Sequence, residues 1–148
     1  MTQRNRIEVM HGVNLDQLGR RPQSVYGDLT FDRLEMRVSD YANDLGLQVR
    51  FFQTNAEHEF VEHLHRLEGL SDAIVMNPGA WTHYAWAIRD ALEVSGLPAV
   101  EVHLSDVDAR EPFRRVSVLD GVCIARVKGL GPDGYRDALA HLKEAFSA

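Results

Sequence analysis

The sequence of 148 residues has a single cysteine and lacks a long apolar run and a signal-peptide core, which are features that mark other classes of protein. Its single cysteine, Cys123, lies in an apolar run and has no second cysteine for an intramolecular disulfide, which favours a reducing compartment. No apolar run approaches the roughly 20 residues that span a bilayer. The residues before the first predicted strand contain no signal-peptide core. We therefore expect a cytoplasmic protein.

Positive charge is also scarce, because 16 Lys and Arg stand against 22 Asp and Glu, for a formal net charge of −6. Nucleic-acid binding depends on an excess of basic residues, so the composition disfavours it. The arginines are unevenly placed: Arg20 and Arg21 share one segment, and Arg110, Arg114 and Arg115 share another. The sequence thus predicts a local positive patch that suits a small anion.

What the sequence does contain is a regular alternation of strand and helix patterns. Short apolar segments predict five strands at 7–10, 47–52, 73–76, 99–102 and 122–127, and helical spacing predicts helices over 29–45, 57–67, 83–94 and 135–146. Thr30 is the predicted N-cap of the first helix and Gly46 its end. Strands interleaved with helices predict one α/β domain over 1–148, with a parallel sheet covered on both faces.

Two long irregular segments, 11–28 and 103–120, each follow a predicted strand. Loops of this length in a compact domain are usually functional. Since the carboxyl ends of parallel strands meet at one edge of the sheet, where ligands bind, we expect both segments to overhang one crevice. We expect residues 19–28 to form a lid over it.

Polar side chains follow two neighbouring predicted strands. The run from Asn77 to His83 begins where the third strand ends, and the run from Glu101 to Ser105 begins where the fourth ends. Together they bring amide, hydroxyl and imidazole groups to the same edge of the sheet. This arrangement predicts a pocket for a small polar molecule.

Two other patterns suggest ligands but have simpler interpretations. The run from Gly129 to Gly134 matches G-x-G-x-x-G, yet it follows the last strand rather than the first, so we interpret it as a turn into the last helix. His58, Glu62 and His65 share one helical face, opposite an apolar stripe, which is typical of a solvent-exposed face rather than a metal site. The sequence predicts neither a cofactor site nor a metal site.

Nine blocks along nearly the whole chain occur in a characteristic order and spacing. They are Gly12-x-Asn14-Leu15-x-x-Leu18-Gly19-Arg20-Arg21, Val25-Tyr26-Gly27, Phe52-Gln53-x-Asn55, Asn77-Pro78-Gly79-Ala80, Thr82-His83, Arg89-Asp90-Ala91-Leu92, Glu101-Val102-His103-Leu104-Ser105, Ala109-Arg110-Glu111-Pro112-Phe113-Arg114 and Gly129-Leu130-Gly131-x-x-Gly134-Tyr135. Through these blocks the sequence resembles the type II 3-dehydroquinate dehydratases, or type II dehydroquinases. The resemblance implies a flavodoxin-like fold, a trimer-based dodecamer, and no metal or organic cofactor.

The resemblance further implies reversible dehydration of 3-dehydroquinate to 3-dehydroshikimate through an enolate. It implies that Tyr26 is the base and that Arg21 assists it. It also implies that His103 donates a proton to the leaving hydroxyl and that Asn14 holds a water against the enolate. It places the substrate-binding residues at Asn77, Gly79, Ala80, His83, Leu104, Ser105 and Arg114, and it implies that Asp90 reaches into a neighbouring subunit's site.

The chemistry of such a dehydration suits these residue types. A guanidinium about 4 Å from a phenolate stabilises it by up to about 4 kcal/mol at a dielectric constant near 20, which is close to the cost of ionising a tyrosine at pH 7. A hydroxyl leaves poorly as hydroxide, so the reaction needs a positioned acid, and histidine titrates in the required range. We expect Arg21 to supply this guanidinium to Tyr26 on closure of the lid.

Several residues depart from the usual family sequence near the predicted site, at His11, Val13, Trp81, Tyr84, Trp86, Asp108 and Val116. None of the changes removes a catalytic residue type. An imidazole at His11, beneath the lid, is expected to alter the local charge. The departures leave open two alternatives, a paralogue acting on a related cyclic hydroxy-ketone acid such as an amino analogue, and a catalytically silent homologue that binds small acids. The sequence also leaves open a biosynthetic or a catabolic role.

Overall fold

The computed structural model describes residues 3–148 and contains one five-stranded parallel sheet. The strands are β1 (Arg6–His11), β2 (Gln48–Gln53), β3 (Ala73–Asn77), β4 (Ala99–His103) and β5 (Ala125–Lys128). They lie in the order β2-β1-β3-β4-β5, and every neighbouring pair is parallel. This is the flavodoxin-like arrangement that the sequence resemblance implied.

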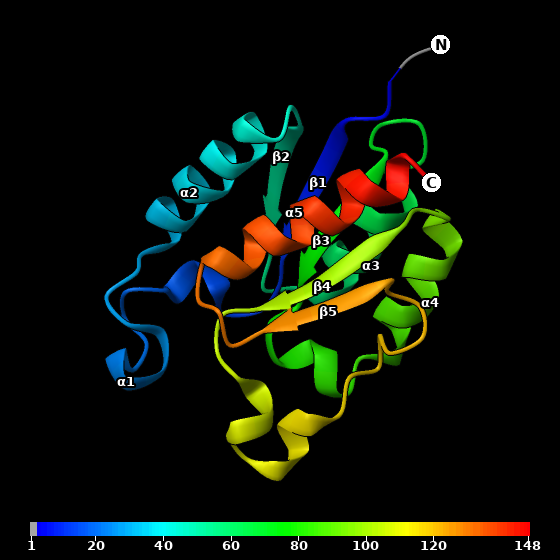
Figure 1. The fold of residues 1–148 in the computed structure, drawn as a ribbon. Coiled ribbons are helices and arrows are strands. Elements are labelled where there is room, and N and C mark those ends of the chain that lie inside the picture. Colours follow the sequence, from blue (N-terminus) through cyan, green and yellow to red (C-terminus); the bar gives the residue numbers. More distant parts are fainter. Residues whose placement is uncertain (1–2) are drawn as a thin grey trace.

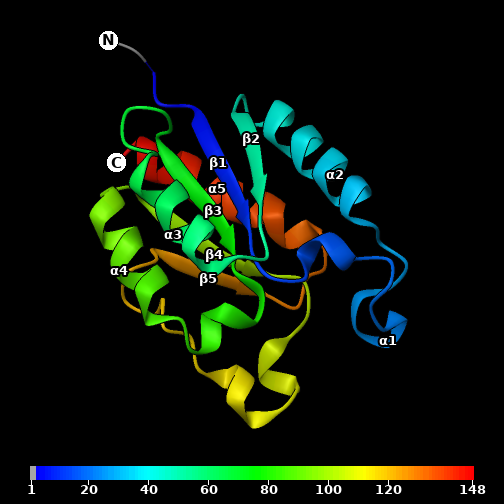
Figure 2. The ribbon, with the colours of Figure 1, turned by 180° about the vertical axis from the view of Figure 1, so that it is seen from behind.

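Helices cover both faces of the sheet, as the alternating pattern predicted. Helices α2 (Phe31–Asp44) and α5 (Asp133–Phe146) lie on one face, and α3 (Glu57–His65) and α4 (Trp86–Ser95) lie on the other (Figures 1 and 2). Successive side chains of a strand point to opposite faces. Val9 accordingly packs into one buried cluster and Met10 into the other.

The predicted start and end of α2 are confirmed. The Thr30 side chain accepts a hydrogen bond from the amide of Arg33 at 3.3 Å, which satisfies one of the free amides at the helix start. Gly46 follows the helix with a φ of 72°, a left-handed conformation that glycine adopts without strain.

Most predicted boundaries agree with the structure to within two residues, but two differ by three residues. The last strand was expected from Val122 but begins at Ala125, because the amides of Val122 and Cys123 both donate to the carbonyl of Leu119 and form a turn. Their side chains still pack against the core on the α3 and α4 face, which explains why the run looks like a strand. The helix expected from His83 begins at Trp86, after a 3-10 turn over Gly79–His83.

The irregular segments extend from the carboxyl ends of the strands. One contains a 3-10 turn (Leu15–Gln17) and the short helix α1 (Gln23–Tyr26), and the other contains two 3-10 turns (Val107–Ala109 and Pro112–Arg115). Figure 1 shows both at the same end of the sheet, α1 in blue and the other segment in yellow. Within the part of the chain that the structure describes, no helix combines the length and apolar character needed to cross a membrane.

Candidate active site

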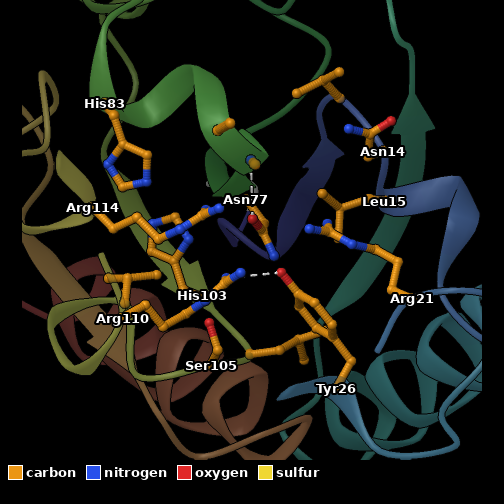
Figure 3. Close-up of a pocket in the computed structure, with 15 residues that line it drawn as sticks. Asn14, Leu15, Arg21, Tyr26, Asn77, His83, His103, Ser105, Arg110 and Arg114 are labelled. Carbon is orange, nitrogen blue, oxygen red and sulfur yellow. Dashed lines mark hydrogen bonds between the residues drawn. The ribbon is translucent and has the colours of Figure 1, made fainter. Parts of the chain in front are cut away.

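A cavity of about 150 Å³ lies where both irregular segments meet the strand ends. Eleven of the twelve residues that the sequence proposed for a site line it, from Asn14, Arg21 and Tyr26 through Asn77, Gly79, Ala80 and His83 to His103, Leu104, Ser105 and Arg114. The lining also includes Val13, Leu15, Val107 and Arg110. Figure 3 shows the side chains of Tyr26, Asn77 and Arg110 meeting near the centre of this set, with Asn14 at its edge.

Two glycines allow the loops after β1 and β3 to approach closely beneath the cavity. The amide of Gly12 donates to the carbonyl of Asn77 at 2.8 Å. A Cβ atom on Gly12 would lie 2.2 Å from the carbonyl oxygen of Pro78, and one on Gly79, whose φ is 66°, would lie 2.5 Å from that of Val13. Only glycine permits this packing, which sets the floor of the site.

Asn14 adopts a left-handed conformation, with a φ of 69°, and it is the one such non-glycine residue among residues 3–148. Its amide donates to the side-chain oxygen of Asn55 at 2.8 Å, and Gln53 donates to the same oxygen at 3.3 Å. Backbone strain of this kind persists where the surroundings hold it in place. The Gln53 and Asn55 side chains thus support the loop that presents Asn14, a role that the sequence did not assign to them.

The Tyr26 hydroxyl contacts a guanidinium other than the expected one. Arg110 donates to this hydroxyl through Nη1 at 3.0 Å. The Arg21 guanidinium lies instead over the face of the phenol ring, 4.3 Å from its centroid. Arg21 thus lies close to the phenol while Arg110 makes the hydrogen bond to its hydroxyl, and the expected role of Arg21 on closure of the lid stays a prediction. The sequence placed Arg110 in a predicted positive patch and in one of the blocks that carry the resemblance, but it assigned no catalytic role to this residue.

His103 forms a buried pair with Glu101, whose carboxylate lies 2.6 Å from the imidazole Nε2. Ser117 donates to the same carboxylate at 2.7 Å, and Thr82 donates as well. Burial acts to raise the pKa of Glu101, but the hydrogen bonds from His103, Thr82 and Ser117 outweigh it, so the pKa is lowered. An ionised Glu101 fixes a proton on Nε2 and leaves Nδ1 for a ligand.

His83 has a defined tautomer, because its Nδ1 donates to the carbonyl of Val116 at 2.7 Å. Burial lowers the pKa of His83, the bond to Val116 opposes this change, and the nearby charges of His103 and Arg114 lower the pKa further. The neutral ring therefore presents Nε2 as a hydrogen-bond acceptor. Such an acceptor suits a hydroxyl on the ligand.

The cavity is positively charged although the chain is acidic. Arg21, Arg110 and Arg114 line it, and none of the described residues lining it is Asp or Glu. Glu111, on the rim, pairs with Arg114. Three guanidinium groups at one small cavity confirm the predicted patch and favour an anionic ligand.

The turn after β5 holds the segment that follows β4. The amides of Gly131 and Gly129 donate to the carbonyls of Leu104 and Ser105, at 3.0 Å and 3.1 Å. This arrangement confirms that the G-x-G-x-x-G pattern is a turn leading into α5. The same turn positions Leu104 and Ser105 at the cavity wall.

Six residues that depart from the family pattern lie outside the cavity lining: His11, Trp81, Tyr84, Trp86, Asp108 and Val116. Trp81 is buried against Phe60, whereas Tyr84 and Trp86 are each 61% exposed. His11 is completely buried, and burial lowers its pKa to about 3. The expectation that His11 alters the local charge is wrong, because the ring remains neutral at ordinary pH.

Two further sets of predicted residues also lie away from the cavity. Asp90, the twelfth proposed site residue, is exposed on α4 and does not line the cavity of its own chain. His58, Glu62 and His65 are exposed on α3, as the sequence predicted for a solvent-facing surface.

These features define an α/β enzyme site for acid–base chemistry on a small anion, with a phenol, an imidazole–carboxylate pair and three guanidinium groups. A family model described as Dehydroquinase class II matches residues 5–143, and the chain belongs to this family. The chain is 46% identical to the 3-dehydroquinate dehydratase of Thermotoga neapolitana, over 96% of its own length and 97% of the relative's.

A second relative and a solved structure agree with this assignment. The chain is 46% identical to the protein named 3-dehydroquinate dehydratase 2 of Pseudomonas putida, over 93% of each chain. Its fold superimposes on the crystal structure of a type II dehydroquinase from Propionibacterium acnes with a TM-score of 0.89, at 40% identity, covering 97% of this chain and 98% of the other.

Proposed function

We propose that the chain is a 3-dehydroquinate dehydratase, a hydro-lyase that converts 3-dehydroquinate to 3-dehydroshikimate in the shikimate pathway. The observation that carries this proposal is the pairing of Tyr26 with Arg110 and of His103 with Glu101 at one cavity. The names of the relatives support it, and they do not favour a paralogue acting on an amino analogue or a catalytically silent homologue.

The reaction begins with Tyr26 as the base. The positive charges of Arg110 and Arg21 stabilise the phenolate, which removes the proton next to the substrate ketone. The electron pair of the broken C–H bond moves to the ketone oxygen and forms an enolate. Asn14 holds a water against this oxygen, and so stabilises the charge that develops there.

The second step expels the hydroxyl as water. The imidazolium of His103 donates its Nδ1 proton to the hydroxyl while the C–O bond breaks, and the enolate electrons form the new C=C bond and restore the ketone. Glu101 stabilises the imidazolium before the transfer. The proton removed by Tyr26 and the one donated by His103 balance the single water lost.

The remaining residues position the substrate. Asn77, His83 and Arg114 bind its ring hydroxyls, while Leu104 and Ser105 hold its carboxylate. Gly79 and Ala80 form the wall between them, and the positive cavity attracts the anionic substrate. None of these steps requires a cofactor or a metal.

An ultraviolet assay of the conjugated enone product tests this proposal. Wild-type protein should convert 3-dehydroquinate, and Tyr26→Phe should lower kcat about 1,000-fold, because the base is lost. Tyr41→Phe is a matched control, since it removes a hydroxyl that bonds Asp133 away from the cavity. An inactive wild-type protein would contradict the function, and an unaffected Tyr26→Phe variant would contradict the mechanism.

We also propose that the enzyme acts in the cytoplasm as a trimer-based dodecamer in which Asp90 completes a neighbouring site. Two exposed aromatic residues support this, because Tyr84 precedes α4 and Trp86 begins it, one helical turn before Asp90. Light scattering should show the oligomer. Mixed oligomers of the Tyr26→Phe and Asp90→Ala variants should regain activity that neither has alone, and an active monomer would contradict the shared site.

A further inference from the structure

A buried chain of hydrogen bonds connects the cavity to residues that do not line it. The Asn77 side chain donates through Nδ2 to the Tyr135 hydroxyl at 3.2 Å, and this hydroxyl lies 2.9 Å from Nε2 of His11. Tyr135, on α5, and His11, at the end of β1, are both fully buried. Of the three residues, only Asn77 lines the cavity.

The hydrogen-bond donors in this chain run in one direction. The amide of Gly79 donates to Oδ1 of Asn77 at 3.2 Å, which fixes the Asn77 amide with its nitrogen toward Tyr135. The Tyr135 oxygen therefore accepts from Asn77 and has its own hydrogen available for Nε2 of His11. The reverse direction, with Nε2 as the donor, would leave both the buried phenol hydrogen and Nδ1 of His11 without partners among residues 3–148, whereas this direction leaves only the Nδ1 hydrogen unpaired.

The surroundings of His11 fit the acceptor role. Burial lowers the pKa of His11, so the ring is neutral and one nitrogen can accept a hydrogen bond. With Nε2 as the acceptor, the proton of His11 resides on Nδ1, which has no partner among residues 3–148. The sequence resemblance assigned no role to Tyr135 or to His11.

We propose that Tyr135 and His11 are positioning residues that hold the Asn77 amide as a hydrogen-bond donor to a hydroxyl of the substrate. One Nδ2 hydrogen of Asn77 bonds Tyr135, and the other remains available to the cavity. With Gly79 on the oxygen and Tyr135 on the nitrogen, the amide can neither rotate nor exchange its two ends. The proposal rests on the dehydratase function proposed above.

Steady-state kinetics of the Tyr135→Phe variant, which keeps the ring but removes the hydroxyl, test the proposal. We expect KM for 3-dehydroquinate to rise about tenfold and kcat to change less than about threefold, because the Asn77 contact serves binding throughout the reaction. Tyr41→Phe should leave both constants unchanged. A thermal unfolding curve of each variant confirms that the protein is folded.

A double-mutant cycle separates positioning of Asn77 from a general structural effect. In an Asn77→Ala background, Tyr135→Phe should raise KM no further, since the amide that it positions is absent. A tenfold rise in KM in both backgrounds, or no rise in the wild-type background, would overturn the proposal. If Tyr135→Phe does not fold, His11→Leu enters the same cycle, because it removes the acceptor of the phenol hydrogen and keeps Tyr135.

The tautomer of His11 gives a measurement that does not depend on activity. Nitrogen-15 NMR of histidine-labelled wild-type protein at pH 7 should show His11 neutral with its proton on Nδ1, and His11→Leu assigns the signal. A proton on Nε2 would overturn the network even in an active enzyme. A protein with the expected tautomer but no dehydratase activity would refute the proposed function and leave the hydrogen-bonded chain intact.

Discussion

Two buried glutamates, Glu8 on β1 and Glu101 on β4, have the same kind of partner in different surroundings. Glu8 is 2% exposed and bonds Nε2 of His63 at 2.7 Å, whereas Glu101 is fully buried and bonds Nε2 of His103 at 2.6 Å. Both carboxyl groups have a lowered pKa, because their hydrogen bonds outweigh the effect of burial, which acts to raise it. As isolated carboxylate–imidazole pairs the two are nearly equivalent.

The surroundings of the two imidazole rings distinguish the Glu8 pair from the Glu101 pair. Each glutamate also has an arginine, Arg50 at 2.9 Å from Glu8 and Arg126 at 3.7 Å from Glu101. The ring of His63, however, stacks on that of Phe52, with centroids 3.8 Å apart. His103 instead lines the cavity with its second nitrogen free of protein partners in residues 3–148. The comparison teaches that a buried carboxylate–imidazole pair becomes available to a ligand through its position at a strand end facing a cavity, and not through its own chemistry.

The largest expected difference between the two pairs is in catalysis. Glu101→Gln should lower kcat about 100-fold, because the amide keeps the size of the side chain but no longer stabilises the imidazolium of His103. The ultraviolet assay measures this change, and thermal unfolding verifies the fold. Glu8→Gln is the matched control. A Glu101→Gln variant with kcat within threefold of wild type would remove the functional distinction between the pairs.

A smaller effect is expected on stability at Glu8. Glu8→Gln should lower the free energy of unfolding by about 1–2 kcal/mol, because His63 and Arg50 lose their charged partner while the half-exposed Arg50 can turn to water. Urea unfolding measures the change, and kcat should remain within about twofold. A loss of activity in a folded Glu8→Gln variant would show that the two clusters are coupled.

The smallest expected effect is the pH dependence of stability. The pKa of Glu8 is lower in the folded chain than its ordinary value of 4.5, so the carboxylate contributes stability above about pH 4.5 and loses it as the pH falls through the folded value. Between pH 6 and pH 3 the unfolding free energy of Glu8→Gln should therefore fall less steeply than that of wild type. Equal slopes would show that the Glu8 pair does not contribute to acid unfolding.

Much of the fold was predictable because its signals are local. The apolar spacing that defines α2 and the cap at Thr30 depend on residues within a few positions, and the structure confirms both. The wrong start predicted for the last strand, at Val122, also comes from reliance on a local signal. An apolar run indicates contact with the core, and here the partly buried Val122 and Cys123 form a turn held by the carbonyl of Leu119 rather than a strand.

Much of the cavity lining was also predictable, since the carboxyl ends of parallel strands must meet at one edge. His103 and Asn77 follow directly from this rule. Arg110 and Glu101 were quoted in the sequence blocks without a role, because 84 residues separate Arg110 from Tyr26 and only their distance in space reveals the contact. His11 was expected to bring charge, and only its complete burial shows that it brings none.

The sequence by itself determined the order of the elements, the parallel sheet, and the residue types available at its carboxyl edge, because hydrophobic periodicity and strand direction are properties of short segments. The tertiary structure alone decided which guanidinium meets the Tyr26 hydroxyl, that His11 is buried away from the cavity, and how Tyr135 meets Asn77. These outcomes depend on distances between segments far apart in the chain, and hydrogen bonds form only where folding brings the atoms within about 3 Å.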